Sequence, residues 1–375
     1  RLTFTADAAA LAACAVVVLS IDIPTGDDNR SDLSAIDRLA EDVVGQLAPG
    51  TTLVILSQVR PGYTRALARR LGPVLQARGL HLLYQVETLI FGRAVERALH
   101  PERTIVGCAD PTVPLPRAYH ELLAAFGCPV LPMRYESAEL CKIAINIFLA
   151  ASVTATNTLA EVCERIGADW AEIAPALRLD RRIGQHAYLA PGLGLAGGNL
   201  ERDLATVQGL AAQHGTDSRI IDAYVGNSTY RRDWALRTLH AGLSRSGGRP
   251  VVAVWGLAYK ENTHSTKNSP SLALIASLPG VTVRAYDPQV TWAAPAGTDF
   301  RQEATAVAAC AGADALVVMT PWPQFAEVDL AAVRAAMRGR LLVDPYGRLD
   351  GGRAEALGFA YHRLGRPARE RSEAA

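Results

Sequence analysis

The chain has 375 residues, of which 49% are hydrophobic and 20% charged, and its formal net charge at pH 7 is +1. This length predicts two or three domains of roughly 100–200 residues each, with enough apolar residues for sizeable cores. The near-neutral charge provides no bulk attraction to nucleic acid, so we expect no such partner. The longest apolar stretch, 8–19, is shorter than the roughly 18 residues that span a membrane and lacks the basic flank of a signal peptide. We therefore expect no membrane partner.

The six cysteines are scattered, without C-x-x-C spacing, at positions 14, 108, 128, 141, 163 and 310. This pattern indicates neither a zinc site nor a disulfide framework, and it is typical of a reducing compartment. We therefore expect no metal and a cytoplasmic location.

The first third of the sequence alternates short apolar runs with amphipathic stretches. Continuous apolar strands separated by helices predict a parallel sheet that is covered on both faces. The expected strands are 15–19, 52–56, 80–86 and 104–107, and the expected helices are 33–47, 63–78 and 118–126.

The middle third is all helical. Residues 137–167 contain no proline or internal glycine and predict one helix of about 30 residues, close to 45 Å long. Its apolar residues are not confined to one stripe, so we expect it to be buried on several sides. Further helices are expected at 170–177, 200–213 and 218–244. We interpret this segment as a spacer and a dimer interface.

The strand–helix alternation resumes after residue 248. The expected strands are 251–255, 281–286, 315–319 and 341–344, and the expected helices are 271–278, 304–311 and 330–337. The predicted fold class is thus α/β, with two Rossmann-like parallel-sheet domains joined by a long central helix and an all-α segment. The predicted boundaries are 1–132, 133–245 and 246–366, followed by a disordered tail at 367–375.

Residues 190–204 read APGLGLAGGNLERDL, with four glycines in seven residues before a predicted helix. Backbone amides in such a loop can hold a phosphate group against a helix N-terminus. The alternative is an ordinary surface turn, and the glycines alone favour neither interpretation.

Two further features place polar side chains where ligands bind. Lys142 and Asn146 lie four residues apart on one face of the predicted long helix, where their desolvation must be compensated. A lysine that extends to solvent at the helix edge is the alternative. A polar loop, 256–270, follows a predicted strand, and the carboxyl ends of parallel strands are where open α/β sheets bind ligands. An ordinary solvated loop would look the same.

Seven ordered segments carry these features together: IPT at 23–25, SQVRPG at 57–62, VETLIFG at 86–92, ELCKIAIN at 139–146, DRRIG at 180–184, the glycine loop at 190–203, and GLAYK with its following loop at 256–270. In order and spacing they resemble the UDP-glucose/GDP-mannose dehydrogenase family of NAD-dependent nucleotide-sugar 6-dehydrogenases. The resemblance covers about residues 2–365.

The resemblance implies a reaction and a set of catalytic roles. Enzymes of this family oxidise C6 of a nucleotide sugar from alcohol to acid in two hydride transfers to NAD⁺, through a cysteine thioester. It implies that Lys142 and Asn146 stabilise the oxyanion and that Asp203 positions water or transfers a proton. Glu87 is implied to orient water for thioester hydrolysis.

The resemblance also implies binding residues and partners. The partners are a UDP- or GDP-sugar and a second copy of the chain in a homodimer, with Arg182 reaching the sugar across the dimer interface. The other implied substrate-binding residues are Tyr188, Gly192, Gly194, Gly197, Gly198 and Lys260. Thr25, Ser57 and Lys267 are implied to bind NAD.

The sequence departs from the family pattern at the nucleophile. Asn199 occupies the position of the catalytic cysteine, and an amide cannot form a covalent thiohemiacetal. Family residues are also replaced by Gln58, Phe91, Glu201-Arg202, His264-Ser265 and Lys267, the last in place of an arginine that would hold phosphate bidentately. We expect the thioester step to be lost, leaving oxidation to the aldehyde, slow oxidation of its hydrate, or binding without turnover.

No G-x-G-x-x-G segment occurs in the sequence, although the family uses one to seat the NAD pyrophosphate. Residues 3–7 already resemble a segment beyond that fingerprint. Real loss of the preceding strands would expose sheet edges, so we favour a sequence that continues before Arg1. If the loss is real, we expect NAD binding to be very weak.

Three interpretations remain open. The first is an NAD-dependent nucleotide-sugar dehydrogenase with altered second-step chemistry, and the second is a catalytically degenerate paralogue that binds nucleotide sugars. A hydroxyacid dehydrogenase of related plan fits the glycine loop and the K-x-x-x-N helix less well. The nucleotide and sugar stay unassigned, with UDP-glucose as the default because it is the commonest family substrate.

Overall fold

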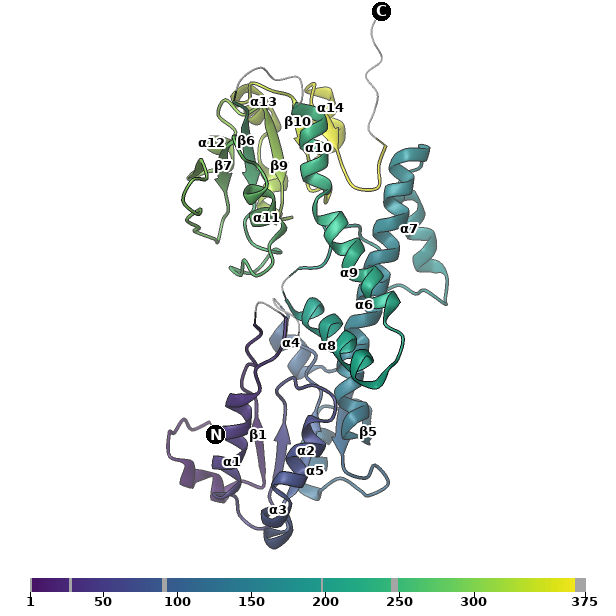
Figure 1. Ribbon diagram of the computed structural model, residues 1–375, viewed down its shortest axis with the longest axis vertical. Helices are drawn as coiled ribbons and strands as arrows, with labels where there is room; N and C mark the ends of the chain where they lie inside the picture. Colours follow the sequence, from purple (N-terminus) through teal and green to yellow (C-terminus); the bar gives the residue numbers. More distant parts are fainter. Residues whose placement is uncertain (1, 27–28, 90–92, 197, 244–248, 368–375) are drawn as a thin grey trace, which may run out of the picture. The chain divides into compact units, whose positions relative to one another are not determined.

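The computed structural model describes residues 2–26, 29–89, 93–196, 198–243 and 249–367 (Figure 1). The chain divides into two compact units, Arg1–Asn146 and Ile147–Ala375. Helix α6 (Tyr135–Ile166) has 32 residues and passes from the first unit into the second. The long helix expected at 137–167 is therefore confirmed. All but the first residue of the expected disordered tail lies outside the described residues.

The first unit is built on a five-stranded sheet in the order β1-β2-β3-β4-β5. The strands are β1 (Val16–Leu19), β2 (Thr52–Ile55), β3 (His81–Gln85), β4 (Thr104–Cys108) and β5 (Val130–Arg134). β4 runs antiparallel to β3, whereas the other neighbours are parallel, so the expectation of an all-parallel first sheet is wrong. Among its described residues, 86–89 and 93–103, the connection to β4 holds the short helix α4 (Ala94–Leu99), which is shorter than the crossover that a parallel neighbour needs.

The helices of this unit depart from expectation mainly where proline intervenes. The single helix expected at 63–78 is two, because Gly72 and Pro73 begin a new helix after Leu71. Strand β5 was missed because it is largely exposed and contains Pro132, a residue confined to sheet edges. The helices are η1 (Ala8–Ala13), α1 (Ser34–Val44), α2 (Tyr63–Arg70), α3 (Gly72–Arg78) and α5 (Arg117–Ala124).

Both faces of the first sheet are buried at its central strands, which explains their continuous apolar runs. Leu53 and Ile55 of β2 pack in one cluster with α1 and α2, while Val54 between them packs with Tyr119 and Leu123 of α5. Alternate residues of the strand therefore enter two separate cores.

A buried carboxylate joins α6 to this unit. Glu139 is fully buried, and its two oxygens accept hydrogen bonds from the backbone N–H of Gly62 at 2.6 Å and of Thr64 at 2.8 Å. These amides stand at the start of α2, where no preceding turn supplies acceptors. Burial raises the pKa of the Glu139 carboxyl, and the hydrogen bonds from Thr64 and Gly62 oppose that rise. Glu139 thus holds the first turns of α6, including the turn that carries Lys142, against the α2 N-terminus.

Replacement of Glu139 by alanine should destabilise the protein by about 2–4 kcal/mol, because two buried N–H groups lose their acceptors. Urea denaturation followed by circular dichroism measures the change. Glu136→Ala on the same helix is the control, since Glu136 pairs with Arg65 at a partly exposed site and should cost less than about 1 kcal/mol. Equal losses for both variants would show that Glu139 is no anchor.

The second unit begins with α6 and four further helices. The helix expected at 218–244 is interrupted at Asp233, which separates two helices. The other expected helices are confirmed. The four are α7 (Trp170–Leu179), α8 (Asn199–His214), α9 (Arg219–Arg232) and α10 (Trp234–Leu243).

Helix α6 is not buried on several sides within the chain, contrary to expectation. Phe148 is 76% exposed, Ile166 71% and Leu159 49%. By length and composition α6 could cross a membrane, and 22% of its most apolar window is buried. The same helix carries Lys142, Asn146 and other polar groups that a lipid-facing helix would have to satisfy in hydrocarbon. We therefore interpret its exposed apolar side chains as a surface that contacts another protein chain.

The C-terminal part of this unit is a six-stranded parallel sheet in the order β11-β10-β9-β6-β7-β8, as expected for a Rossmann-like domain. The short outer strands β8 and β11 were not expected, because they are only partly buried and carry no continuous apolar run such as that of β10. The strands are β6 (Val251–Trp255), β7 (Thr282–Tyr286), β8 (Phe300–Gln302), β9 (Ala315–Val318), β10 (Leu341–Val343) and β11 (Ala360–His362). The helices are α11 (Pro270–Ala276), α12 (Ala306–Ala309), η2 (Pro323–Glu327), α13 (Leu330–Ala336) and α14 (Gly351–Ala356).

Candidate functional site

The first unit carries the candidate residues at strand ends and on α6. Lys142 and Asn146 are half-buried and four residues apart, so they project from one face of the helix. Glu139 lies one turn before Lys142, and its anchoring to α2 limits the movement of this face. A cation and an amide donor held together in this way can stabilise a developing oxyanion.

Thr25, Ser57 and Glu87 follow β1, β2 and β3. Ser57 is buried and donates a hydrogen bond to the carbonyl of Ile21 at 2.6 Å, which leaves its oxygen able to accept one. Thr25 pairs with Ser31 in a short antiparallel bridge, and Glu87 accepts a hydrogen bond from the backbone N–H of Leu89. Residues 90–92 of this motif lie outside the described residues.

These strand ends fit part of a dinucleotide. Hydroxyl groups at the carboxyl ends of β1 and β2 are placed where open α/β sheets bind ligands. The glycine-rich turn that would cradle a pyrophosphate is not in the sequence. Thr25 and Ser57 remain candidates for contacting NAD in this unit.

The second unit carries the glycine loop, which is firmly anchored and is not a free surface turn. Asn157 of α6 accepts the N–H of Gly192 at 2.8 Å, and Ser228 of α9 accepts the N–H of Leu195 at 2.8 Å. Trp170 of α7 donates its indole N–H to the carbonyl of Leu189 at 2.7 Å. Three helices therefore determine the path of the loop.

Two glycines of this loop are required by its backbone. Gly194 has φ +78°, and a β-carbon there would lie 2.4 Å from the carbonyl oxygen of Ser228. Gly198 has φ +90° and is the residue before α8. Larger residues would be strained at either position. Gly197, the other glycine expected to bind substrate here, lies outside the described residues.

A carboxylate of this chain, that of Glu201, already binds the N-terminus of α8. One carboxylate oxygen of Glu201 accepts the N–H of Gly198 at 2.9 Å, and the other accepts the side-chain amide of Asn268 at 3.0 Å. The amides of positions 192, 195 and 198 are thus bound by this chain's own side chains. The backbone N–H groups that were expected to bind a phosphate are therefore largely hydrogen-bonded to side chains of the same chain.

Asn199 is the first residue of α8, and its side chain is exposed. Asp203, one turn later, is buried and forms a 3.2 Å ion pair with Arg202, which is also buried. Asn199 and Asp203 therefore lie on the same face of α8, four residues apart. The amide of Asn199 cannot act as a nucleophile.

The loop after β6 is held by a carboxylate that the sequence analysis missed. Asp287, which follows β7, accepts the N–H groups of Leu257 and Ala258 at 2.6 and 3.1 Å and the indole N–H of Trp322 at 3.1 Å. An aspartate directly after a buried strand was the available signal. This network places Lys260 at the carboxyl end of the sheet.

Two lysines of the 256–270 loop were expected to bind ligands, and the structure shows their surroundings in this unit. Lys260 is half-buried, and burial lowers the pKa of its ammonium, so a diphosphate would relieve its desolvation. Lys267 lies beside Gly198, where a β-carbon would be 3.3 Å from the lysine side chain. Tyr346, also missed, follows β10 beside Gly192, and burial raises the pKa of its hydroxyl. The structure thus brings the glycine loop, Lys267 and Tyr346 together.

Arg182 and Tyr188 lie at the surface. The guanidinium of Arg182 is 88% exposed and binds Asp180 at 2.6 Å, while Tyr188 is 49% exposed. An exposed arginine of this kind is free to contact another molecule, because a surface ion pair contributes little.

Models of three domains of one family match the chain in order. The UDP-glucose/GDP-mannose dehydrogenase NAD-binding domain matches 1–126, the central domain 136–228 and the UDP-binding domain 253–351. A UDP-glucose 6-dehydrogenase of Pseudomonas aeruginosa is 34% identical, covering 98% of this chain and 84% of the relative. The chain belongs to the UDP-glucose/GDP-mannose dehydrogenase family. Members of this family are NAD-dependent oxidoreductases that act on a CH–OH group of a nucleotide sugar.

Other members of the family agree with this assignment. A UDP-glucose 6-dehydrogenase of Bacillus subtilis is 29% identical over 98% of this chain and 80% of its own length. The structure of a UDP-glucose dehydrogenase from Pyrobaculum islandicum is 27% identical, with a TM-score of 0.77 over 96% of this chain and 84% of that one. A UDP-D-ManNAc dehydrogenase from Pyrococcus horikoshii, at 24% identity, shares the fold with a TM-score of 0.82 over 97% and 84%.

Glu201→Ala should release the loop before α8, because Gly198 and Asn268 both lose their acceptor. We expect a loss of about 0.5–2 kcal/mol in unfolding free energy and faster hydrogen exchange in a peptide that covers 190–204. Glu172→Ala in the first turn of α7 is the control, since Glu172 is exposed and should leave this peptide unchanged. Unchanged exchange in the Glu201 variant would contradict the proposed role of its carboxylate.

Proposed function

We propose that this protein is an NAD-dependent dehydrogenase that oxidises C6 of a UDP- or GDP-sugar to the aldehyde and lacks the thioester route to the acid. One observation carries the proposal: Lys142, Asn146 and Asp203 are present at the family's positions, whereas the nucleophile position holds Asn199. UDP-glucose is our default substrate, supported by the names of the relatives and by the match to a UDP-binding domain.

The first oxidation needs groups that this chain has. NAD⁺, when bound, accepts the hydride from C6. The alcohol proton must leave as the carbonyl forms, and the ammonium of Lys142 and the amide of Asn146 stabilise the intervening alkoxide. Thr25, Ser57 and Lys267 would contact the cofactor, and Lys260 would hold the diphosphate. Asp203 would receive or relay the proton through water.

The second oxidation through a thioester needs a thiolate, and three of the cysteines are poorly suited to supply one. Cys108, Cys163 and Cys310 are buried, and burial raises the pKa of each thiol, to about 12 for Cys310. A protonated thiol is a poor nucleophile. Without the covalent intermediate, Glu87 has no thioester to hydrolyse, and the reaction stops at the aldehyde or continues slowly through its hydrate.

Counting NADH against sugar tests this chemistry. The native protein should form about one NADH per sugar, with an aldehyde that hydrazide reagents trap. Asn199→Cys should restore the thioester route, yielding two NADH per sugar and an acid product, because the new thiol would lie one turn from Asp203.

Asn199→Ser is the matched control, since it removes the amide without adding a thiol and should behave like the native protein. Two NADH per sugar from the native protein would overturn the proposed arrest at the aldehyde.

The alternative function is a paralogue that binds nucleotide sugars without turnover. Asn199 favours it, because an amide cannot act as the nucleophile. Calorimetry that shows UDP-glucose binding, with no NADH formed by the native protein or by Asn199→Cys, would support this alternative.

We also propose a homodimer in the cytoplasm, with the three-part division at 1–132, 133–245 and 246–366. Exposed apolar side chains gather on α6, α7 and the loop after it, and an apolar surface of this kind favours a protein partner. They include Phe148, Ile166, Leu179 and Ile183. A second copy would cover them and bring in Arg182, whose guanidinium is exposed.

Phe148→Glu should convert the dimer to monomer in sedimentation velocity, because it places a charge within the proposed apolar interface. Val113→Glu in the first unit is the control: Val113 is 59% exposed but lies away from these helices in sequence, and its replacement should leave the dimer intact. A dimer that persists in the Phe148 variant, or a monomeric native protein, would contradict the proposal.

A further inference from the structure

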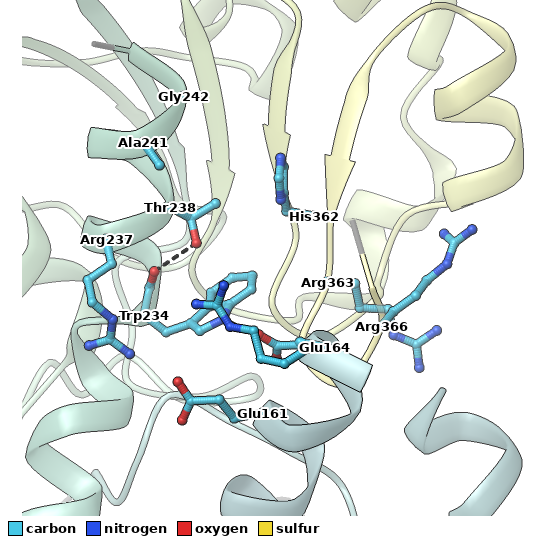
Figure 2. Close-up of a pocket in the computed structure, with 11 residues that line it drawn as sticks. Glu161, Glu164, Trp234, Arg237, Thr238, Ala241, Gly242, His362, Arg363 and Arg366 are labelled. Atoms are coloured by element: carbon cyan, nitrogen blue, oxygen red, sulfur yellow. Dashed lines mark hydrogen bonds between the residues drawn. The ribbon is translucent and has the colours of Figure 1, made fainter. Parts of the chain in front are cut away.

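A polar pocket lies within the second unit. It has a volume of about 430 Å³ and lies between the last turns of α6, helix α10, and residues 362–366 at the end of β11. Figure 2 shows Trp234, Arg237 and Thr238 of α10 on one side, and His362 and Arg363 on the other. Its volume is within the range of about 300–1,000 Å³ that is typical of small-molecule sites. None of the residues assigned above to nucleotide-sugar or NAD binding lines it.

The acidic residues of this pocket already have partners within the chain. Glu161 accepts the Tyr230 hydroxyl at 2.7 Å and lies 2.9 Å from Nη1 of Arg231. Glu164 accepts the backbone N–H of Gly365 at 2.9 Å and the indole N–H of Trp234 at 3.0 Å. These carboxylates are therefore structural acceptors, and a cation would have to displace their donors.

A buried arginine forms ion pairs with the carboxylates of Glu161 and Glu164. Arg231 is fully buried and lies 3.6 Å from Glu164 as well as beside Glu161. Its nitrogens contact these oxygens as ion pairs without aligned hydrogen bonds. The single positive charge of Arg231 thus neutralises one of the two negative charges of Glu161 and Glu164.

The basic residues are in excess. Within the described chain, Arg165, Arg237 and Arg363 form no ion pair with a carboxylate, while Arg366 pairs with Glu355 at 3.1 Å. Arg366 and Glu355 neutralise each other. The negative charges of Glu161 and Glu164 are then set against four positive charges, those of Arg231, Arg165, Arg237 and Arg363, which leaves an excess of two positive charges. Burial lowers the pKa of His362, which therefore adds a neutral ring and no charge at pH 7.

Arg237 is held in a fixed orientation with a donor to spare. Its guanidinium stacks on the Tyr230 ring at 4.0 Å, and Nη1 donates to the Tyr230 carbonyl at 2.8 Å. Nη2 is buried and has no hydrogen-bond partner. A buried guanidinium nitrogen without an acceptor is costly, and a charged oxygen in the pocket would satisfy it.

We propose that this pocket binds a phosphoryl anion, either inorganic pyrophosphate or the diphosphate of a free nucleotide, at a site separate from the nucleotide-sugar site. The anion would be held by Arg165 and Arg237, with Arg363 contributing positive charge from the opposite side. Because α6, α10 and residues 362–366 all line the pocket, a bound anion joins three segments of one unit and stabilises their packing.

Titration calorimetry of the full chain with pyrophosphate at low ionic strength tests the site. We expect the native protein to bind and Arg165→Gln to bind at least about tenfold more weakly, with Arg165→Lys retaining most of the affinity. Arg165 is exposed and has no carboxylate partner in the described chain, so its replacement should leave the fold intact. Arg237→Gln should weaken binding further, and circular dichroism checks its folding.

Arg178→Gln on α7 is the matched control and should bind like the native protein, since Arg178 does not line the pocket. Free UDP distinguishes a nucleotide diphosphate from inorganic pyrophosphate as the ligand. If UDP displaces pyrophosphate and binds more weakly to Arg165→Gln, the pocket binds a nucleotide. If UDP binding is unchanged in that variant, the pocket binds inorganic pyrophosphate. No binding of pyrophosphate by the native protein, or equal binding by the native protein and Arg165→Gln, would overturn the proposal.

Discussion

The structure depends on one element, the 32-residue helix α6, which supplies buried acceptors to other segments of the chain while much of its apolar surface stays exposed. Three polar side chains of α6 bind three different neighbouring segments. Glu139 binds the start of α2, Asn157 binds the glycine loop, and Glu164 binds Trp234 and Gly365. Loss of any of these contacts leaves buried donors without acceptors, so the path of each segment is tied to α6.

This constraint has direct consequences for chemistry. Lys142 and Asn146, which we propose stabilise an oxyanion, follow Glu139 on the turns of α6 that are anchored within the first unit. The proposed nucleophile position, Asn199, begins α8 in the second unit. Under the proposed function, the amide at this position removes the thioester step, whereas the groups for the first oxidation remain.

Glu201 shows how the same scaffold limits binding. A loop with four glycines beside a helix start is typical of a phosphate site, yet its amides bind Asn157, Ser228 and Glu201. The glycines are needed for positive φ angles and close backbone approach. Under the proposed function, Lys260 and Lys267 supply positive charge toward the diphosphate in place of these amides.

Much of the fold and the inventory of candidate residues could be predicted from the sequence, because helix and strand periodicity and the identity of each side chain are local properties. The long helix, the C-terminal parallel sheet and the amide at position 199 are of this kind. Only the tertiary structure decided the reversed strand β4, the internal partners of the glycine loop, and the polar pocket between α6, α10 and residues 362–366. These depend on contacts between residues far apart in the chain, such as that between Glu164 and Gly365, which are 201 positions apart, and no local pattern records them.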